Sequence, residues 1–244
     1  MYLGILASKR NNKKMKTISN IIYLLLLIIS LICSTIFVPY TSVYAKERGE
    51  KNNQEQQNSI QICCAWGEQL ADGELTYKIS GGNSGIREAI RTAVRQWDLD
   101  IAGLTLSEVK DGSSSADIYF SFKKDGSSLA DTKTKHGLLT AGLTTFTINW
   151  RGLIEETHVT IAKGVSGRGF TSDQIELVAK HEMGHALGLG HSNFRTSIMS
   201  PTISNRQTGV ISDCEINAVL SANAWKLVNN NSKPHSVVGS KIEC

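Results

Sequence analysis

Three histidines and one glutamate within a short stretch carry the most specific chemistry of this chain. Residues 181–191 read HEMGHALGLGH, which fits the pattern HExxHxxGxxH. His181 and His185 are four residues apart, so on a helix both imidazoles lie on one face and can reach one ion. Gly188 can adopt a positive φ, so the helix can end there and the chain can bring His191 back as a third ligand. Three protein ligands leave a zinc ion one position for a water.

Glu182 directly follows the first of these histidines. Its carboxylate can take a proton from a zinc-bound water, whose pKa the metal lowers to about 7, and can pass that proton to a leaving amine. We therefore expect His181, His185 and His191 to hold one catalytic Zn²⁺ and Glu182 to act as the general base. The sequence shows no Ser-His-Asp arrangement and no phosphate-binding loop that would indicate another chemistry.

A methionine follows the histidine motif at a short distance, within residues 197–201 (SIMSP). With Met199 eight residues after His191, the sequence resembles the metzincins, whose long zinc motif is followed by a methionine-containing turn under the metal. Among the metzincins it is most similar to the matrixins (the matrix metalloprotease family), in which a serine such as Ser192 follows the third histidine. Pro201 stands where astacins and serralysins usually carry a tyrosine.

This resemblance implies an α+β fold, a metzincin-like zincin catalytic domain with a mixed twisted sheet, an active-site helix, a backing helix and a C-terminal helix. It implies a zinc metalloendopeptidase whose partner is an extended protein or peptide substrate. In the family, that substrate pairs with an edge strand, which we place at residues 141–150. The resemblance puts the pocket for the residue after the scissile bond near Leu177, Pro201, Thr202 and Ile203, although Leu177 fits core packing equally well.

The apolar periodicity predicts the elements that position the motif. Strands are predicted at residues 75–79, 104–109, 117–122, 146–150 and 157–161. A helix between the first two strands has an apolar face made of Ile86, Ala89, Ile90, Ala93, Val94 and Trp97. This order also resembles the N-terminal half of a matrixin catalytic domain.

Two capping boxes predict where the later helices begin. Thr171 and Gln174 fit the start of the active-site helix, and Ser212 and Glu215 fit the start of a helix near the C-terminus. The second helix resembles the closing helix of matrixins.

The first 45 residues indicate export. Basic residues precede an apolar run over residues 21–38, and residues 43–45 (VYA) fit a cleavage site, so residues 1–45 are predicted to be a signal peptide. An uncleaved N-terminal anchor is the alternative, because the run is nearly long enough to span a bilayer. The protein is expected to be secreted, or held at the cell surface if the segment is retained, and only then does it contact a membrane.

The remaining chain divides into three predicted parts. Residues 46–65 are a polar spacer or short pro-segment, residues 66–228 the metalloprotease catalytic domain, and residues 229–244 a C-terminal tail. Beyond residue 45 the chain has 21 basic and 22 acidic residues, so its charge indicates no nucleic-acid partner.

Four cysteines lie outside the predicted signal peptide: Cys63, Cys64, Cys214 and Cys244. An even number in an exported chain favours disulfides. Adjacent cysteines are strained when they pair with each other, so we expect Cys63 and Cys64 each to bond one of the other two. In an alternative, Cys63 or Cys64 ligates the zinc in a latent form, as in matrixin pro-segments, but the matrixin cysteine motif is absent.

Vertebrate-type matrixins also hold a structural zinc and calcium in a loop rich in His, Asp and Gly. Only His136 and His158 lie in similar places, and Leu138 stands where the aspartate is expected, so no second zinc is predicted and calcium stays open. A zinc-binding but inactive peptide-binding domain is the alternative function, against which Glu182 argues. An accidental motif in a surface protein is a third reading, against which His191 and Met199 argue.

Overall fold

The structure is a computed structural model that describes residues 57–109, 115–124, 141–165, 167–202, 207–229 and 232–244. These residues belong to one folded unit, Glu55–Cys244. The predicted signal peptide lies outside the described residues. Among the residues described, no helix has the length and apolar character needed to cross a membrane.

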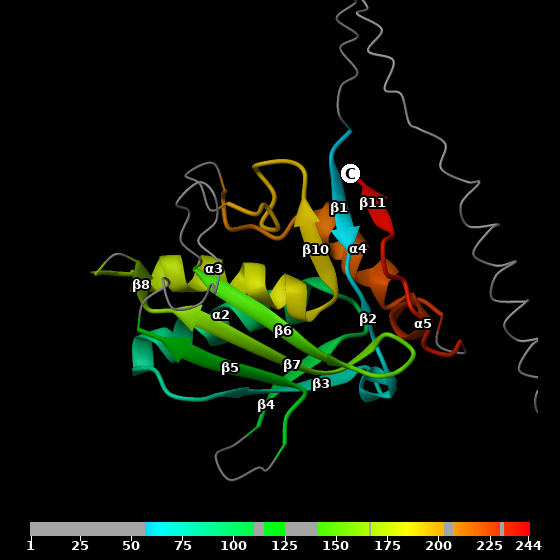
Figure 1. Cartoon of the computed structure of the whole chain (residues 1–244), viewed down its shortest axis with the longest axis horizontal. Helices are drawn as coiled ribbons and strands as arrows, with labels where there is room; N and C mark the ends of the chain where they lie inside the picture. Colours follow the sequence, from blue (N-terminus) through cyan, green and yellow to red (C-terminus); the bar gives the residue numbers. More distant parts are fainter. Residues whose placement is uncertain (1–56, 110–114, 125–140, 166, 203–206, 230–231) are drawn as a thin grey trace, which may run out of the picture. The chain divides into compact units, whose positions relative to one another are not determined.

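A six-stranded mixed sheet forms one layer of this unit (Figure 1). Its strand order is β2-β7-β5-β3-β4, and β6 pairs with β7. All pairs are parallel except β6 with β7. The strands are β2 (Ala65–Trp66), β3 (Glu74–Ile79), β4 (Thr105–Glu108), β5 (Ile118–Lys123), β6 (Gly142–Ile148) and β7 (Leu153–Ala162). The mixed sheet and the helices that accompany it confirm the predicted α+β fold.

One face of the sheet is apolar because alternate residues of each strand point to it. In β3, for example, Leu75, Tyr77 and Ile79 are buried while the residues between them are partly exposed. The five predicted strands therefore match β3 to β7, with shifts at their ends.

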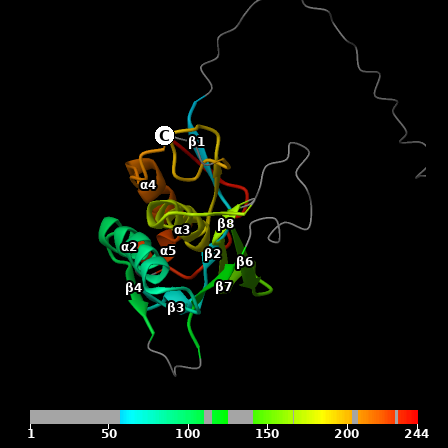
Figure 2. The same ribbon diagram turned by 90° about the vertical axis from the view of Figure 1, so that its left-hand side faces the viewer.

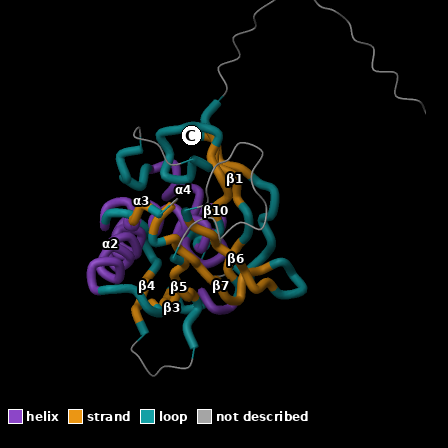
Figure 3. Tube along the Cα trace, turned by 60° about the vertical axis from the view of Figure 1, so that its left-hand side comes forward, coloured by secondary structure: helices purple, strands orange, loops and turns teal. Residues whose placement is uncertain are grey.

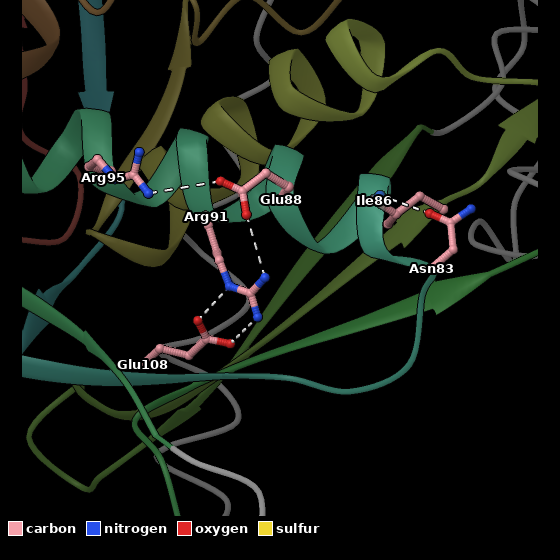
Figure 4. Close-up of polar contacts among 6 residues, drawn as sticks. All are labelled: Asn83, Ile86, Glu88, Arg91, Arg95 and Glu108. Atoms are coloured by element: carbon pink, nitrogen blue, oxygen red, sulfur yellow. Dashed lines mark hydrogen bonds and ion pairs between the residues drawn. The ribbon is translucent and has the colours of Figure 1, made fainter.

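Helix α2 (Ser84–Asp100) packs against this sheet and against α3. Asn83 caps its start by accepting a hydrogen bond from the Ile86 N–H at 2.9 Å. The predicted apolar face is buried apart from Ile86, which packs at its margin. On the charged face, Arg91 forms a bidentate pair with Glu108 of β4, at 2.7 and 3.0 Å (Figure 4), and so joins the helix to the sheet.

Helix α3 (Ser172–Ala186) lies beside α2 and contacts β6 and β7 (Figure 2). Thr171 accepts a hydrogen bond from the Gln174 N–H, and the Gln174 side chain accepts one from the Thr171 N–H, so the predicted capping box is confirmed. Buried Trp97 of α2 donates its indole N–H to the Lys180 carbonyl at 3.0 Å. The two helices are thus joined next to His181.

A second, three-stranded sheet has the order β10-β1-β11 (Figure 1), and β1 and β10 are also seen in Figure 3. Its strands are β1 (Ser59–Ile62), β10 (Leu189–Ser192) and β11 (Lys241–Glu243), and β1 pairs antiparallel with both neighbours. The folded unit therefore begins before residue 66, the predicted start of the catalytic domain, and the predicted tail contributes a strand.

Short elements complete the fold. Helix α4 (Asp213–Ala222) begins at the predicted capping box of Ser212 and Glu215 and packs against β1 and β11. The other short elements are η1 (Glu68–Leu70), β8 (Gly164–Val165), β9 (Arg168–Gly169) and α5 (Ala224–Leu227).

The predicted disulfide pairing is wrong, although disulfides are present. Cys63 bonds Cys64, and Cys214 bonds Cys244. Strand β11 brings Cys244 to the start of α4, where the Cα atoms of Cys214 and Cys244 are 5.3 Å apart. Cys63 and Cys64 lie instead at the Gly188 turn, because both of their N–H groups donate to the Gly188 carbonyl. Neither can act as a thiolate ligand in the latent form considered above.

Candidate metal centre

The three histidines of the sequence motif converge. His181 and His185 come from adjacent turns of α3, and His191 comes from β10. One ring nitrogen from each lies within 4.8 Å of the others. The His191 ring centroid is 4.9 Å from that of His185 and 5.5 Å from that of His181. Within the described residues this is the one group of His, Cys, Asp or Glu side chains that could hold a metal ion.

Two backbone carbonyls fix the orientation of the helical histidines. His181 Nδ1 lies 2.7 Å from the Ile198 oxygen, and His185 Nδ1 lies 2.8 Å from the Leu189 oxygen. A carbonyl only accepts, so each Nδ1 carries the proton and each Nε2 presents a lone pair. The two Nε2 atoms are 3.1 Å apart. Two facing lone pairs without a proton fit a shared cation, and imidazole nitrogen suits zinc.

Burial keeps these histidines neutral. It lowers the pKa of His181 to about 4 and that of His185 to about 3, and it lowers the pKa of the more exposed His191 as well. Neutral imidazole is the form that binds a metal. The site therefore has its ligands in the binding form at neutral pH.

Gly188 makes the turn that returns His191, as the sequence predicted. It has a φ of 102°. A Cβ at this position would overlap the Cys64 carbonyl oxygen, so the glycine also allows the close approach of the N-terminal segment. The turn thus depends on both the backbone conformation and the lack of a side chain.

Glu182 is buried between α3 and β6, with 4% of its surface exposed. The Thr144 hydroxyl donates to its Oε2 at 2.7 Å, and its Oε1 lies over Gly142. Burial raises the pKa of Glu182 to about 7, against the lowering effect of the Thr144 hydrogen bond. A carboxyl with a pKa near the working pH is suited to accept and release a proton.

Met199 is fully buried beneath the helix. Its thioether packs against Gly184, which lies between the two helical histidines. The turn is tied to α4, because Glu215 accepts from the Ser197 hydroxyl at 2.6 Å and from the Ile198 N–H at 3.2 Å. Since Ile198 also orients His181, buried Glu215 supports a histidine that it does not touch.

Comparison with known protein families decides the identity of the chain. The matrixin family model matches residues 65–221, which include the histidine motif, Thr144 of β6, Met199 and Glu215. The chain belongs to the matrixin family. It is therefore a zinc metalloendopeptidase of the matrixin type. No curated protein matches the chain.

Strand β6 is the edge strand that was predicted for residues 141–150 in this matrixin. The Ala141 carbonyl accepts from the Ala162 N–H, so the backbone groups of alternate residues from Ala141 onward face β7. Those of Gly142, Thr144 and Phe146 consequently face away from it. No strand pairs with that outer side in the described part of the chain.

The residues predicted for the substrate pocket are only partly described. Leu177 is half-buried at the edge of the core and lies close to Gly209. Pro201 and Thr202 are exposed, and Ile203 lies outside the described residues. Of the two histidines considered for a structural metal, His136 also lies outside them. His158 stacks on Tyr119 and lies 2.7 Å from a Glu156 oxygen.

Sequence reasoning missed Thr144 and Glu215 as parts of the site. Thr144 is one of several threonines in a strand, and Glu215 was read as a capping residue alone. Alternation in β6 could have indicated that Thr144 faces the helix, but not that it meets Glu182.

Proposed function

We propose that this matrixin is an exported endopeptidase in which His181, His185 and His191 hold the catalytic zinc and Glu182 is the general base. The observation that carries the proposal is the buried Glu182 carboxyl next to three converging histidines, two of which are oriented by backbone carbonyls. The apolar run at residues 21–38 supports export.

His181, His185 and His191 would hold a zinc ion, which would serve as a Lewis acid toward the scissile carbonyl and would lower the pKa of a water to about 7. Glu182 accepts a proton from the attacking water and delivers it to the leaving amine. Thr144 holds Oε2 of Glu182, so the carboxylate keeps one orientation during both transfers. Met199 supports the helix from below and takes no part in proton transfer.

The substrate lies extended along the outer side of β6, antiparallel to it, and pairs with its outward backbone groups. Leu177, Pro201, Thr202 and Ile203 are the proposed surroundings of the residue after the scissile bond. Pro201, Thr202 and Ile203 are proposed because they directly follow Met199 and its turn. Leu177 is proposed because it lies close to Gly209.

A mixed peptide library, incubated with the zinc-loaded protein, tests this function. The intact protein should cleave, and Glu182→Ala should bind zinc equally well but lose about a hundred- to ten-thousandfold in rate, as a missing acid–base group predicts. Zinc content, measured after dialysis, separates a missing base from a missing metal.

Two outcomes would contradict the proposal. Zinc binding without cleavage by the intact protein favours the inactive peptide-binding alternative. Equal cleavage by the intact protein and by Glu182→Ala would remove Glu182 as the base.

A further inference from the structure

Two large apolar side chains are exposed where the edge strand ends. Ile148 at the end of β6 is 57% exposed, and Trp150 in the following turn is 92% exposed. We call these two residues the distal patch. An exposed isoleucine is ordinary by itself, but a tryptophan exposed this far only two residues along the chain marks a surface that can bind an apolar group.

The distal patch continues the row of residues that reaches the catalytic carboxylate. Alternation puts Gly142, Thr144, Phe146 and Ile148 on one face of β6. Thr144 contacts Glu182, and Phe146 packs at the edge of the core. The bulge near the end of the β6–β7 pair leaves one β7 residue unpaired, so it does not disturb the alternation in β6. Ile148 therefore lies on the same face as Thr144, beyond the part that is covered.

The turn that carries Trp150 is well braced. Asn149 Oδ1 accepts from the Arg151 N–H at 2.9 Å and from the Leu153 N–H at 3.1 Å. The Arg151 guanidinium lies 5.7 Å from the Trp150 ring centroid and 3.8 Å from a Glu68 oxygen. One face of the indole is thus supported by a cation that is itself paired, which leaves an aromatic surface for another partner.

We propose that the distal patch binds an apolar side chain of the peptide substrate, about four to six residues before the scissile bond. The inference rests on the proposed function. A substrate antiparallel to β6 runs toward its own N-terminus as β6 runs from Thr144 to Ile148. Thr144 and Ile148 are separated by four strand steps, or about 14 Å. A substrate residue at the patch therefore lies at least four residues before the substrate residue opposite Thr144, which is close to the scissile bond.

A membrane surface is the competing partner, since tryptophan also occurs at membrane interfaces. The peptide is favoured because the patch continues the same strand and the same face that carry Thr144. It offers a subsite in line with the extended chain.

The test uses three peptides that share one cleavage site chosen from the library. One is short, with two residues before the scissile bond. The two long ones have eight, with either leucine or serine at the fourth to sixth positions before that bond. We expect kcat/KM of the leucine peptide to exceed that of the serine peptide about three- to tenfold, the size of one aromatic contact, mainly through KM.

Substitutions in the patch should change that ratio. Trp150→Ala should bring the leucine-to-serine ratio close to one, while Trp150→Phe should keep most of it. Leu99→Ala is the matched control, because Leu99 is 74% exposed on α2 and lies outside β6 and its turn. The ratio should be unaffected in that variant.

Several results would overturn the inference. One is a leucine-to-serine ratio of kcat/KM near one in the intact protein. If Trp150 then proves necessary for binding to lipid vesicles, the membrane is the partner of the patch. Another is a ratio that survives Trp150→Ala. If even the short peptide is not cleaved, the proposed function fails separately; equal binding of the two long peptides by zinc-loaded Glu182→Ala would then reject the distal patch as well.

Discussion

At the scale of single residues, the site is prepared by opposing effects on one carboxyl. Burial raises the pKa of Glu182 to about 7, while the hydroxyl of Thr144 donates to its charged form and lowers it. Burial lowers the pKa of the neighbouring histidines His181 and His185, so they too are held in the neutral form. One buried environment thus gives a proton acceptor and uncharged metal ligands.

The raised pKa of Glu182 predicts a pH-dependent effect of Glu182→Gln on the metal-free protein. The group has a pKa of about 7 when folded and 4.5 ordinarily, so the folded state binds more protons between these values. Its stabilisation is complete below pH 4.5 and is lost as pH rises through 7. Glutamine avoids that loss, so the free energy of unfolding should increase by up to about 3 kcal/mol at pH 8 and hardly at all at pH 4.

Urea unfolding in the presence of a chelator measures this difference. Glu155→Gln, a change at an exposed carboxyl of β7, serves as the control. An equal gain at both pH values would show that packing, and not charge, causes the effect.

At the scale of elements, the third ligand depends on a strand and not on the helix. β10 carries His191 and pairs with β1, while the preceding turn at Gly188 meets Cys64. Asn193 reinforces the pairing, since its side chain accepts from the Ser59 N–H at 2.8 Å and donates to the Gln57 carbonyl at 3.0 Å. The segment before the predicted catalytic domain therefore helps to position the metal centre.

Gly188→Ala should damage both stability and zinc binding. The alanine would have to adopt a φ of 102°, and its Cβ would overlap the Cys64 oxygen. We expect a cost above the roughly 1 kcal/mol of left-handed backbone alone. Displacement of β10 should weaken zinc affinity about ten- to hundredfold, as losses of orienting residues do.

Gly167→Ala provides the comparison, because Gly167 has a φ of 77° and its Cβ would meet nothing within 4 Å. In that control, thermal unfolding should show only the stability loss of a left-handed alanine, and zinc titration should show an unchanged affinity. Equal effects of the two substitutions on zinc affinity would argue against the role of the turn.

At the scale of the whole folded unit, the first described strand pairs with the last one. β11 pairs with β1, and the Cys244 N–H donates to the Asn58 carbonyl at 2.8 Å. The Cys214–Cys244 disulfide then ties this end to α4. The tail is thereby linked, through β1, to the strand that carries His191.

The two disulfides should differ strongly in their effect on stability. Cys214 and Cys244 are 30 residues apart, so their bond closes a long loop, and changing both to serine should cost about 3 kcal/mol. Cys63 and Cys64 are adjacent and close no such loop. Denaturant unfolding of the two double variants, with zinc present, should place the larger loss in the Cys214/Cys244 pair; the reverse order would contradict this account.

The sequence by itself determined the local parts of this protein. The spacing of His181 and His185, the caps at Thr171 and Ser212, and the alternating strands all depend on contacts within a few residues. Such patterns follow from helix and strand geometry, so they could be read without the fold. The matrixin resemblance came from the same short-range spacing.

The tertiary structure alone decided which distant groups meet. Thr144 reaches Glu182 across 38 residues, and Asn223 accepts from the Trp66 N–H across 157. The adjacent cysteines paired with each other because β11 delivered Cys244 to Cys214, a result of strand pairing that no local pattern encodes. Partners far apart in sequence are selected by the packing of whole elements, and that packing is a property of the complete fold.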